Sequence, residues 1–463
     1  MLNRAISSGQ GRIFSFFALA LVLAVYLLVG SEYRPQNIDD PWYLSFADNY
    51  VNHGITADRV FGQDAAGESG VQLFGITHAF VYGHVLNRIG WSRTNAYILS
   101  ALFIFAAVFI WWHILLKLGW SRTERVVFAV GLLLAEPVFG AAHQARPDAM
   151  IFMLLAAGLY LAVIKQFLAA GLLAALAIEI HPVGGIVAVY VLSFLGAHLA
   201  DAKSSLRDSI KHGLIFAAGG LLGIIYYLVL HWTALPQLAG GMQAADGGGG
   251  FNNALVEYFW HTKYKRHLPE LVLMLLAGLL YVVRKRWRTE SFSGLSFLAG
   301  IAFLIAIRRP NFMYMIFVFP AFLLLVLAAF RDLIRPEYIL ASFVVYMLPQ
   351  YALVLYLNRN FDLNDYLAKL KACTPDNNLP VVGAPNDWYA FRAGDFYARC
   401  RDDGIANLKL TNFYYIAEEQ AKYPASPAVK RDLSKYNLTS LTNFTANAGN
   451  FHVIRASIRK NTP

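Results

Sequence analysis

The sequence predicts a mainly α-helical, polytopic membrane protein with about eleven transmembrane helices and a small α/β domain in its C-terminal part. Two features of composition support this prediction. Of the 463 residues, 57% are hydrophobic and only 15% are charged, against roughly 25% charged residues in an average soluble domain. A soluble globule of this size needs more polar residues to cover its surface. Such hydrophobicity also excludes a disordered chain.

The third observation is a series of apolar runs, each close to the roughly 20 residues that a helix needs to cross about 30 Å of hydrocarbon. They are 13–30, 95–116, 126–142, 149–164, 167–180, 183–199, 213–231, 270–283, 292–307, 311–330 and 338–357. A twelfth segment, 72–89, is apolar but carries two histidines and an arginine. We expect this segment to lie at the membrane interface.

The basic residues of the loops orient these helices. If 72–89 does not span, the loops on the side of the N-terminus hold 15 Lys and Arg residues and the opposite loops hold 10. If 72–89 spans, the two numbers exchange, so the positive-inside rule favours the first arrangement. The long loops 31–94 and 232–269 and the tail then lie on the extracytoplasmic side, which we expect to be the periplasmic side of a bacterial inner membrane. The net charge of +10 is explained by loops that meet anionic lipid headgroups, so no nucleic-acid partner is expected.

The chain divides into a transmembrane domain, 1–357, and a soluble extracytoplasmic α/β domain, 358–463. In the second domain, residues 362–372 are predicted as a helix, and 379–384 and 451–455 as strands. The only two cysteines, Cys373 and Cys400, both lie there. Two cysteines in one extracytoplasmic domain predict a disulfide; the alternative is two unrelated buried thiols.

Two adjacent carboxylates, Asp39 and Asp40, follow the first apolar run and open an amphipathic segment that includes Tyr43 and Ala47. Paired carboxylates at a membrane surface can serve as a general base, bind a metal ion, or do both. The alternative is structural: Asp39 caps this helix, and Pro41 lies in its first turn.

Further polar residues fall on the same predicted face. Arg146 and Asp148 lie between two apolar runs, and His181 precedes a proline that interrupts another. Arg308 and Arg309 form a two-arginine turn that suits phosphate binding. Each signal also has a structural explanation, as a helix cap or a salt bridge. Their position on one face favours a shared function.

The pattern Asp39-Asp40-x-x-Tyr43-x-x-x-Ala47, followed by Gly54, resembles the signature in the first periplasmic loop of GT-C glycosyltransferases. The nearest resemblance is to family 39, the protein O-mannosyltransferases and the aminoarabinose transferases of lipid A. Over about residues 10–330, two more elements are similar to that family: Arg146-Pro-Asp148, and a late span with Tyr314 and Pro320, in which Met313 replaces the family's arginine.

The resemblance implies transfer of a sugar from a polyprenyl-phosphate donor to a lipid, glycan or protein acceptor, with inversion at the anomeric carbon. Asp39 would be the general base. Asp40 and Asp148 would position the acceptor or a divalent cation. The residues that would bind the donor phosphate are Arg146, His181, Arg308, Arg309, Tyr43 and Tyr314.

Two other classes of protein remain open from the sequence. A transporter or lipid flippase also has intramembrane polar residues and broken helices, and a membrane scaffold could use its tail to bind a partner. No tightly spaced metal-ligand motif is present, so a divalent cation held by Asp39, Asp40 and Asp148 stays optional. No other cofactor is predicted.

Overall fold

The structure is a computed structural model. It describes residues 17, 19–30, 39–54, 75–201, 204–232, 254–261, 267–307, 311–358, 362–374, 376, 378–392, 394–399, 404–418, 425–446 and 449–458. These residues fold as two compact units. The helical unit comprises the described parts of Met1–Ser31, Leu73–Thr77 and Ile98–Leu353, and the α/β unit comprises those of Glu32–Gln72, His78–Tyr97 and Val354–Pro463.

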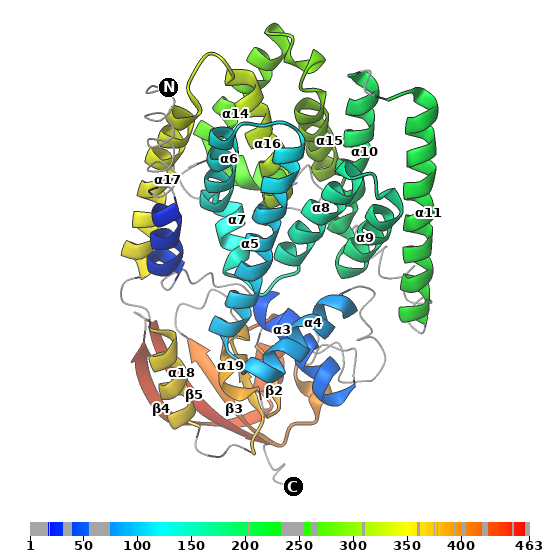
Figure 1. Cartoon of the computed structure of the whole chain (residues 1–463). Coiled ribbons are helices and arrows are strands. Elements are labelled where there is room, and N and C mark those ends of the chain that lie inside the picture. Colours follow the sequence, from blue (N-terminus) through cyan, green and yellow to red (C-terminus); the bar gives the residue numbers. More distant parts are fainter. Residues whose placement is uncertain are drawn as a thin grey trace. The chain divides into compact units, whose positions relative to one another are not determined.

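Each of the eleven predicted apolar runs coincides with helical structure. The main elements are η1 (Val25–Val29), α5 (Arg93–Lys117), α6 (Arg122–Leu134), α7 (Glu136–Ala142), α8 (Asp148–Val163), α9 (Phe167–Ile180), η2 (Pro182–Gly185), α10 (Ile186–Ala200), α11 (Leu206–Leu230), α13 (Ala254–Val256), η4 (Glu257–His261), α14 (Leu268–Val283), η6 (Arg286–Arg288), α15 (Ser291–Ile307), η7 (Phe312–Phe317), α16 (Phe319–Phe330) and α17 (Pro336–Asn358). Figure 1 shows α8, α9, α10 and α11 as neighbours in one group of helices.

Not all of these helices are long enough to cross a bilayer. Among the described residues, four helices pass a test of length and composition, and a fifth span results if α6 and α7, bent by 63°, count as one. The bend follows from the chain itself, because Ala135 has an extended backbone and Pro137 lies in the first turn of α7. Six further apolar helices are 10–17 residues long. Eleven membrane spans therefore remain a prediction.

The segment 72–89 contains a short helix, α4 (Ile76–Ile89), of 14 residues. A helix of this length extends about 21 Å, less than the roughly 30 Å of the hydrocarbon core. It is not one of the candidate spans in the described part of the chain. Its dimensions agree with the expected position at an interface.

Glycines allow close packing of helices in the helical unit. A Cβ atom at Gly171 in α9 would lie 2.1 Å from the backbone oxygen of Phe216, and one at Gly219 in α11 would lie 2.0 Å from the backbone oxygen of Leu168. Small residues at such crossings are typical of membrane helix pairs. The opposite face of α11 exposes large apolar side chains, among them Val229 at 73%, as a lipid-facing surface would.

Loops assigned to the cytoplasmic side are joined by ion pairs. Arg331, which follows α16, contacts Glu124 of α6 at 2.8 Å and also pairs with Glu290. Arg286 and Asp332 form a second pair at 2.5 Å. These contacts bring together segments that the charge pattern places on one side of the membrane.

The α/β unit is built around a five-stranded mixed sheet with the order β2-β1-β3-β5-β4. Its elements are α3 (Asp39–His53), α4, α18 (Leu363–Ala372), β1 (Val381–Gly383), η8 (Pro385–Asp387), α19 (Trp388–Phe391), β2 (Phe396–Ala398), η9 (Ala406–Leu408), β3 (Asn412–Glu418), α20 (Pro427–Leu433), β4 (Tyr436–Ala446) and β5 (Gly449–Ile458). Strand β1 runs parallel to β2 and β3, and β5 is antiparallel to β3 and β4. The predicted helix at 362–372 and the strands at 379–384 and 451–455 are confirmed.

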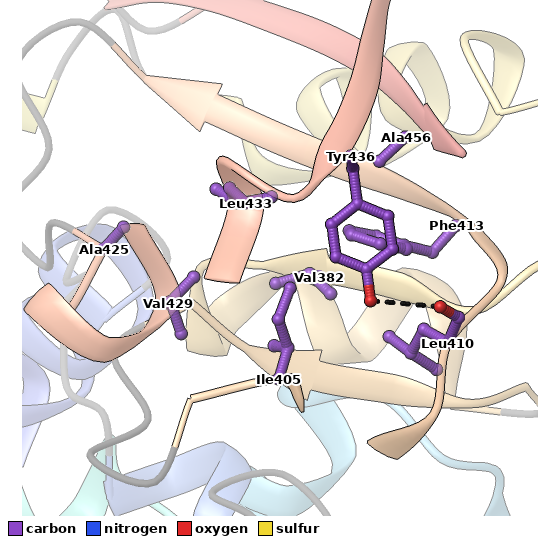
Figure 2. Close-up of a cluster of buried hydrophobic side chains, with 9 residues drawn as sticks. All are labelled: Val382, Ile405, Leu410, Phe413, Ala425, Val429, Leu433, Tyr436 and Ala456. Atoms are coloured by element: carbon purple, nitrogen blue, oxygen red, sulfur yellow. Dashed lines mark hydrogen bonds between the residues drawn. The ribbon is translucent and has the colours of Figure 1, made fainter. Parts of the chain in front are cut away.

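A compact hydrophobic core stabilises this sheet (Figure 2). Val382 of β1 and Phe413 of β3 are fully buried, as are Ile405 and Val429 from the segments that pack beside them. Tyr436 is largely buried, and its hydroxyl donates a hydrogen bond to the backbone oxygen of Leu410 at 3.0 Å. That bond satisfies the one polar atom of an otherwise apolar contact.

The predicted disulfide is not supported. Cys373 follows α18 as a free, half-buried thiol, and Cys400 lies outside the described residues. Membership of one domain does not bring two cysteines within the roughly 4.4–6.8 Å between Cα atoms that a disulfide requires. The compartment of a domain does not constrain this distance.

Candidate active site

Helix α3 presents the paired carboxylates in its first turn. The helix begins at Asp39, with Pro41 at its third residue, as the sequence predicts. Backbone N–H groups and the dipole at a helix N-terminus favour negative charge there. Asp40 is buried at 1% exposure, whereas Asp39 is half-buried. The two carboxylates therefore differ in accessibility.

Asp40 is held by a chain of side-chain hydrogen bonds within the α/β unit. Tyr97 donates its hydroxyl to Oδ2 of Asp40 at 2.7 Å. Nε of Arg93 donates to the same hydroxyl at 2.5 Å, and the guanidinium lies 5.1 Å from the centre of the Tyr97 ring. These contacts fix the orientation of Asp40 and place the positive charge of Arg93 next to Tyr97, the hydrogen-bond donor to Asp40. Asp39 is the more accessible of the two carboxylates.

Tyr43 occupies the buried side of α3. Its ring lies edge-on to His78 at 5.5 Å, and His78 stacks on Tyr82 at 4.2 Å. Helices α3 and α4 pack closely, because a Cβ at Gly83 would come 2.7 Å from the Ala47 backbone oxygen, and Ala47 itself is fully buried. Part of the motif therefore has a packing role.

Helix α19 of the C-terminal region contacts the same group of helices. Nη1 of Arg392 pairs with Oδ1 of Asp48 in α3 at 2.7 Å. The Arg392 guanidinium also lies 5.1 Å from the ring centre of Trp91, which meets Trp388 edge-on at 6.3 Å. Tyr389 lies between these anchors along the chain, and its hydroxyl interacts electrostatically with Asp40.

Arg146 and Asp148 are paired in the helical unit, as the Arg-x-Asp spacing suggests. Nε of Arg146 donates to Oδ2 of Asp148 at 2.7 Å, and both side chains are buried. Tyr314 in η7 forms a further hydrogen bond with Arg146. The ring of Tyr314 lies 5.9 Å from that of His181, whose Nδ1 accepts from the backbone N–H of Val183 at 3.2 Å. The helical unit thus assembles four predicted residues from three separate segments.

Glu179, beside this group in sequence, holds residues 75 and 76, which also belong to the helical unit. Its carboxylate accepts the backbone N–H of Ile76 at 2.9 Å and contacts Nε2 of His231 at 3.1 Å, and its backbone oxygen accepts from Gly75 at 2.6 Å. Glu179 and His231 are almost fully buried. An ionisable residue at the end of an apolar helix signals a specific partner, so the sequence did contain this clue.

Comparison with solved structures identifies the fold. Across 95% of this chain and 97% of the other, the structure matches ArnT from Cupriavidus metallidurans bound to undecaprenyl phosphate, with a TM-score of 0.62 and 12% identity. The chain has the GT-C fold. The oligosaccharyltransferase of Archaeoglobus fulgidus also matches. Its complex with Zn and sulfate gives a TM-score of 0.53 at 12% identity, covering 92% of this chain and 71% of that one.

The apo form of the same oligosaccharyltransferase gives a TM-score of 0.53 at 11% identity, with 98% of this chain and 75% of that one covered. No protein-family model matches the sequence, and a search of curated proteins found no match. At 11–12% identity these likenesses show a shared fold, which fits the resemblance to GT-C glycosyltransferases.

The remaining predicted site residues are distributed as follows. Asp39, Asp40 and Tyr43 belong to the α/β unit, while the group around Arg146 belongs to the helical unit. Arg308 and Arg309 lie outside the described residues. Within the described part of the chain, no group of three or more His, Cys, Asp or Glu side chains is arranged to hold a metal ion.

Sequence reasoning missed four residues near α3: Arg93, Tyr97, Tyr389 and Arg392. The first two open the apolar run of α5 and look like ordinary flanking residues of a membrane helix. The other two lie about 300 residues further along the chain. Only tertiary structure brings them to the acidic motif.

Proposed function

We propose that the chain is an inverting membrane glycosyltransferase that uses a polyprenyl-phosphate-linked sugar and acts on the extracytoplasmic face. The GT-C fold supports this class of protein. ArnT, which matches over nearly the whole chain, is a protein seen with undecaprenyl phosphate bound. The observation that carries the proposal is the acidic pair at the start of α3, where Asp40 is buried and accepts a hydrogen bond from Tyr97 and Asp39 is half-buried.

In the proposed reaction, the acceptor hydroxyl or amine attacks the anomeric carbon of the sugar. The bond between this carbon and the phosphate oxygen breaks, and polyprenyl phosphate leaves with the electron pair. Asp39 accepts the proton that the acceptor loses. Asp40 orients the acceptor. Since no enzyme nucleophile bonds to the sugar, the anomeric configuration inverts.

The departing phosphate needs positive charge. Arg146 is proposed for this role, because Asp148 and Tyr314 fix its orientation and a guanidinium binds phosphate oxygens through two parallel hydrogen bonds. His181, Arg308 and Arg309 are proposed as further phosphate contacts. No step of this mechanism uses a metal ion.

The test is transfer of label from a series of polyprenyl-phosphate sugars in membranes that contain wild-type or Asp39→Asn protein. Loss of a general base should lower the rate by a hundredfold or more at unchanged protein level. Asp365→Asn is the matched control, because Asp365 is an exposed carboxylate that pairs only with a neighbouring lysine in α18 among its described ion pairs. It should leave the rate unchanged.

Two outcomes contradict the proposal. Full activity of Asp39→Asn would remove Asp39 from its role as the base. Absence of transfer by the wild type with every donor would favour the transporter interpretation. That class predicts donor-dependent movement of a lipid or solute without a new glycosidic bond.

A further inference from the structure

One tyrosine hydroxyl in the α/β unit is buried without an apparent purpose. Tyr389 lies in α19, which follows η8 in the connection from β1 to β2. Its hydroxyl has no hydrogen-bond partner among the residues that the structure describes. A buried hydroxyl without a hydrogen-bond partner is destabilising. A phenylalanine would avoid this cost, so the oxygen calls for an explanation.

The surroundings of this hydroxyl are those of the candidate active site. The charges of Asp40 and Arg93 both act on it. Burial, and to a smaller extent the negative charge of Asp40, raises the pKa of Tyr389, so the phenol stays protonated at neutral pH. It therefore offers one donor and two lone pairs in a helix that is joined to α3 by the Arg392–Asp48 ion pair.

Helix α19 is held rigidly against α3. The Arg392–Asp48 ion pair at 2.7 Å and the edge-on contact of Trp388 with Trp91 flank Tyr389 on both sides in sequence. In the preceding turn, Asp387 accepts hydrogen bonds from Tyr366 and from the backbone N–H of Ala384. A polar group fixed in place and left unsatisfied is preorganised for a ligand.

We propose that Tyr389 is an acceptor-binding residue, whose hydroxyl forms a hydrogen bond with the nucleophilic hydroxyl or amine of the acceptor beside Asp39 and Asp40. This inference rests on the proposed glycosyl transfer and extends it. It gives the C-terminal part of the α/β unit a direct role in recognition of the acceptor. The donor phosphate makes no contact with this residue in the proposal.

The test compares Tyr389→Phe with the wild type. Transfer from a labelled undecaprenyl-phosphate sugar is measured against a concentration series of three acceptors: detergent-extracted envelope lipids, a soluble oligosaccharide and a serine/threonine peptide. With the acceptor that works, the substitution should raise the acceptor KM about tenfold, the loss expected for one hydrogen bond. The donor KM should not change.

Stability distinguishes binding from a structural role. Tyr389→Phe should not lower the thermal unfolding temperature in detergent, since the lost oxygen has no partner among the described residues. Tyr338→Phe is the matched control, because Tyr338 is 61% exposed in α17 and the loss of its hydroxyl should alter neither KM.

Each remaining outcome has a defined meaning. An unchanged acceptor KM in Tyr389→Phe, with the wild type active, would overturn this inference and leave the proposed function intact. A lower kcat with unchanged KM, or a lower unfolding temperature, would also overturn it. Absence of transfer by the wild type and by Tyr338→Phe would overturn the proposed function and this inference with it.

Discussion

The buried carboxyl of Asp387 makes the stability of the α/β unit depend on pH. The side chain is 1% exposed, and it accepts hydrogen bonds from Tyr366 at 2.6 Å and from the Ala384 backbone N–H at 2.8 Å. Burial raises its pKa from 3.8 to about 6, although these bonds and the charge of Arg399 act in the opposite direction. Loss of solvation outweighs the favourable contacts.

The magnitude follows from the two pKa values. A rise from 3.8 to about 6 corresponds to about 3 kcal/mol between the protonated and ionised forms. Because the pKa is raised in the folded state, the stabilising contribution is complete below pH 3.8. It is lost as the pH rises through 6. The contribution of Asp387 to the free energy of unfolding of this unit should therefore fall as the pH rises from 3.8 to about 6.

The assay is native-state hydrogen exchange of the full-length protein in detergent, which reports the opening free energy of β1 and β3 without assuming two-state unfolding. Asp387→Asn cannot ionise. As the pH rises from about 4 to 7, the wild type should lose about 3 kcal/mol of protection relative to the variant. A difference between the two proteins that stays constant with pH would refute the reasoning.

Two further predictions concern the helical unit. Gly184→Ala should abolish the folded, monodisperse peak in size-exclusion chromatography, because the added Cβ would lie 2.0 Å from the backbone oxygen of Ala177. The control is Gly213→Ala, where an added Cβ meets nothing within 4 Å. This variant should elute like the wild type. Arg331→Met should lower the free energy of unfolding by about 1–3 kcal/mol, since Glu124 loses the cation that lies 2.8 Å away. The control is Arg335→Met, because Arg335 is exposed. A decrease in unfolding temperature no larger than that of the control would contradict the prediction.

Most helices could be predicted from the sequence, because an apolar segment in a bilayer must satisfy its backbone hydrogen bonds internally and a helix does so. Strands β2, β3 and β4 are absent from the sequence prediction. Strand β2 has only 3 residues, and its pairing with β1 is set by the tertiary fold. The count of spanning helices is also uncertain from sequence, since segments such as α8 are apolar throughout but have only 16 residues.

The sequence suggests candidate site residues where polar side chains gather in a short motif, as in Asp39-Asp40 and Arg146-Pro-Asp148, and the structure shows the Arg146–Asp148 contact. It was unpredictable where distant segments meet. Tyr97 donates a hydrogen bond to Asp40 across 57 residues of sequence, and no pattern near either residue predicts this contact. A buried hydroxyl such as that of Tyr389 is recognisable only when its lack of partners can be seen.

The position of Tyr389 in the connection between two parallel strands has a consequence for how acceptor preference could change. The register of β1 with β2 is fixed by Val381 opposite Phe396 and Gly383 opposite Ala398, and η8 and α19 lie in the connection between the two strands. A segment of this kind can be exchanged while the strands keep their pairing. With Tyr389 in its proposed role, grafting this connection between related chains would transfer recognition of the acceptor as a module, with the carboxylates of α3 left in place.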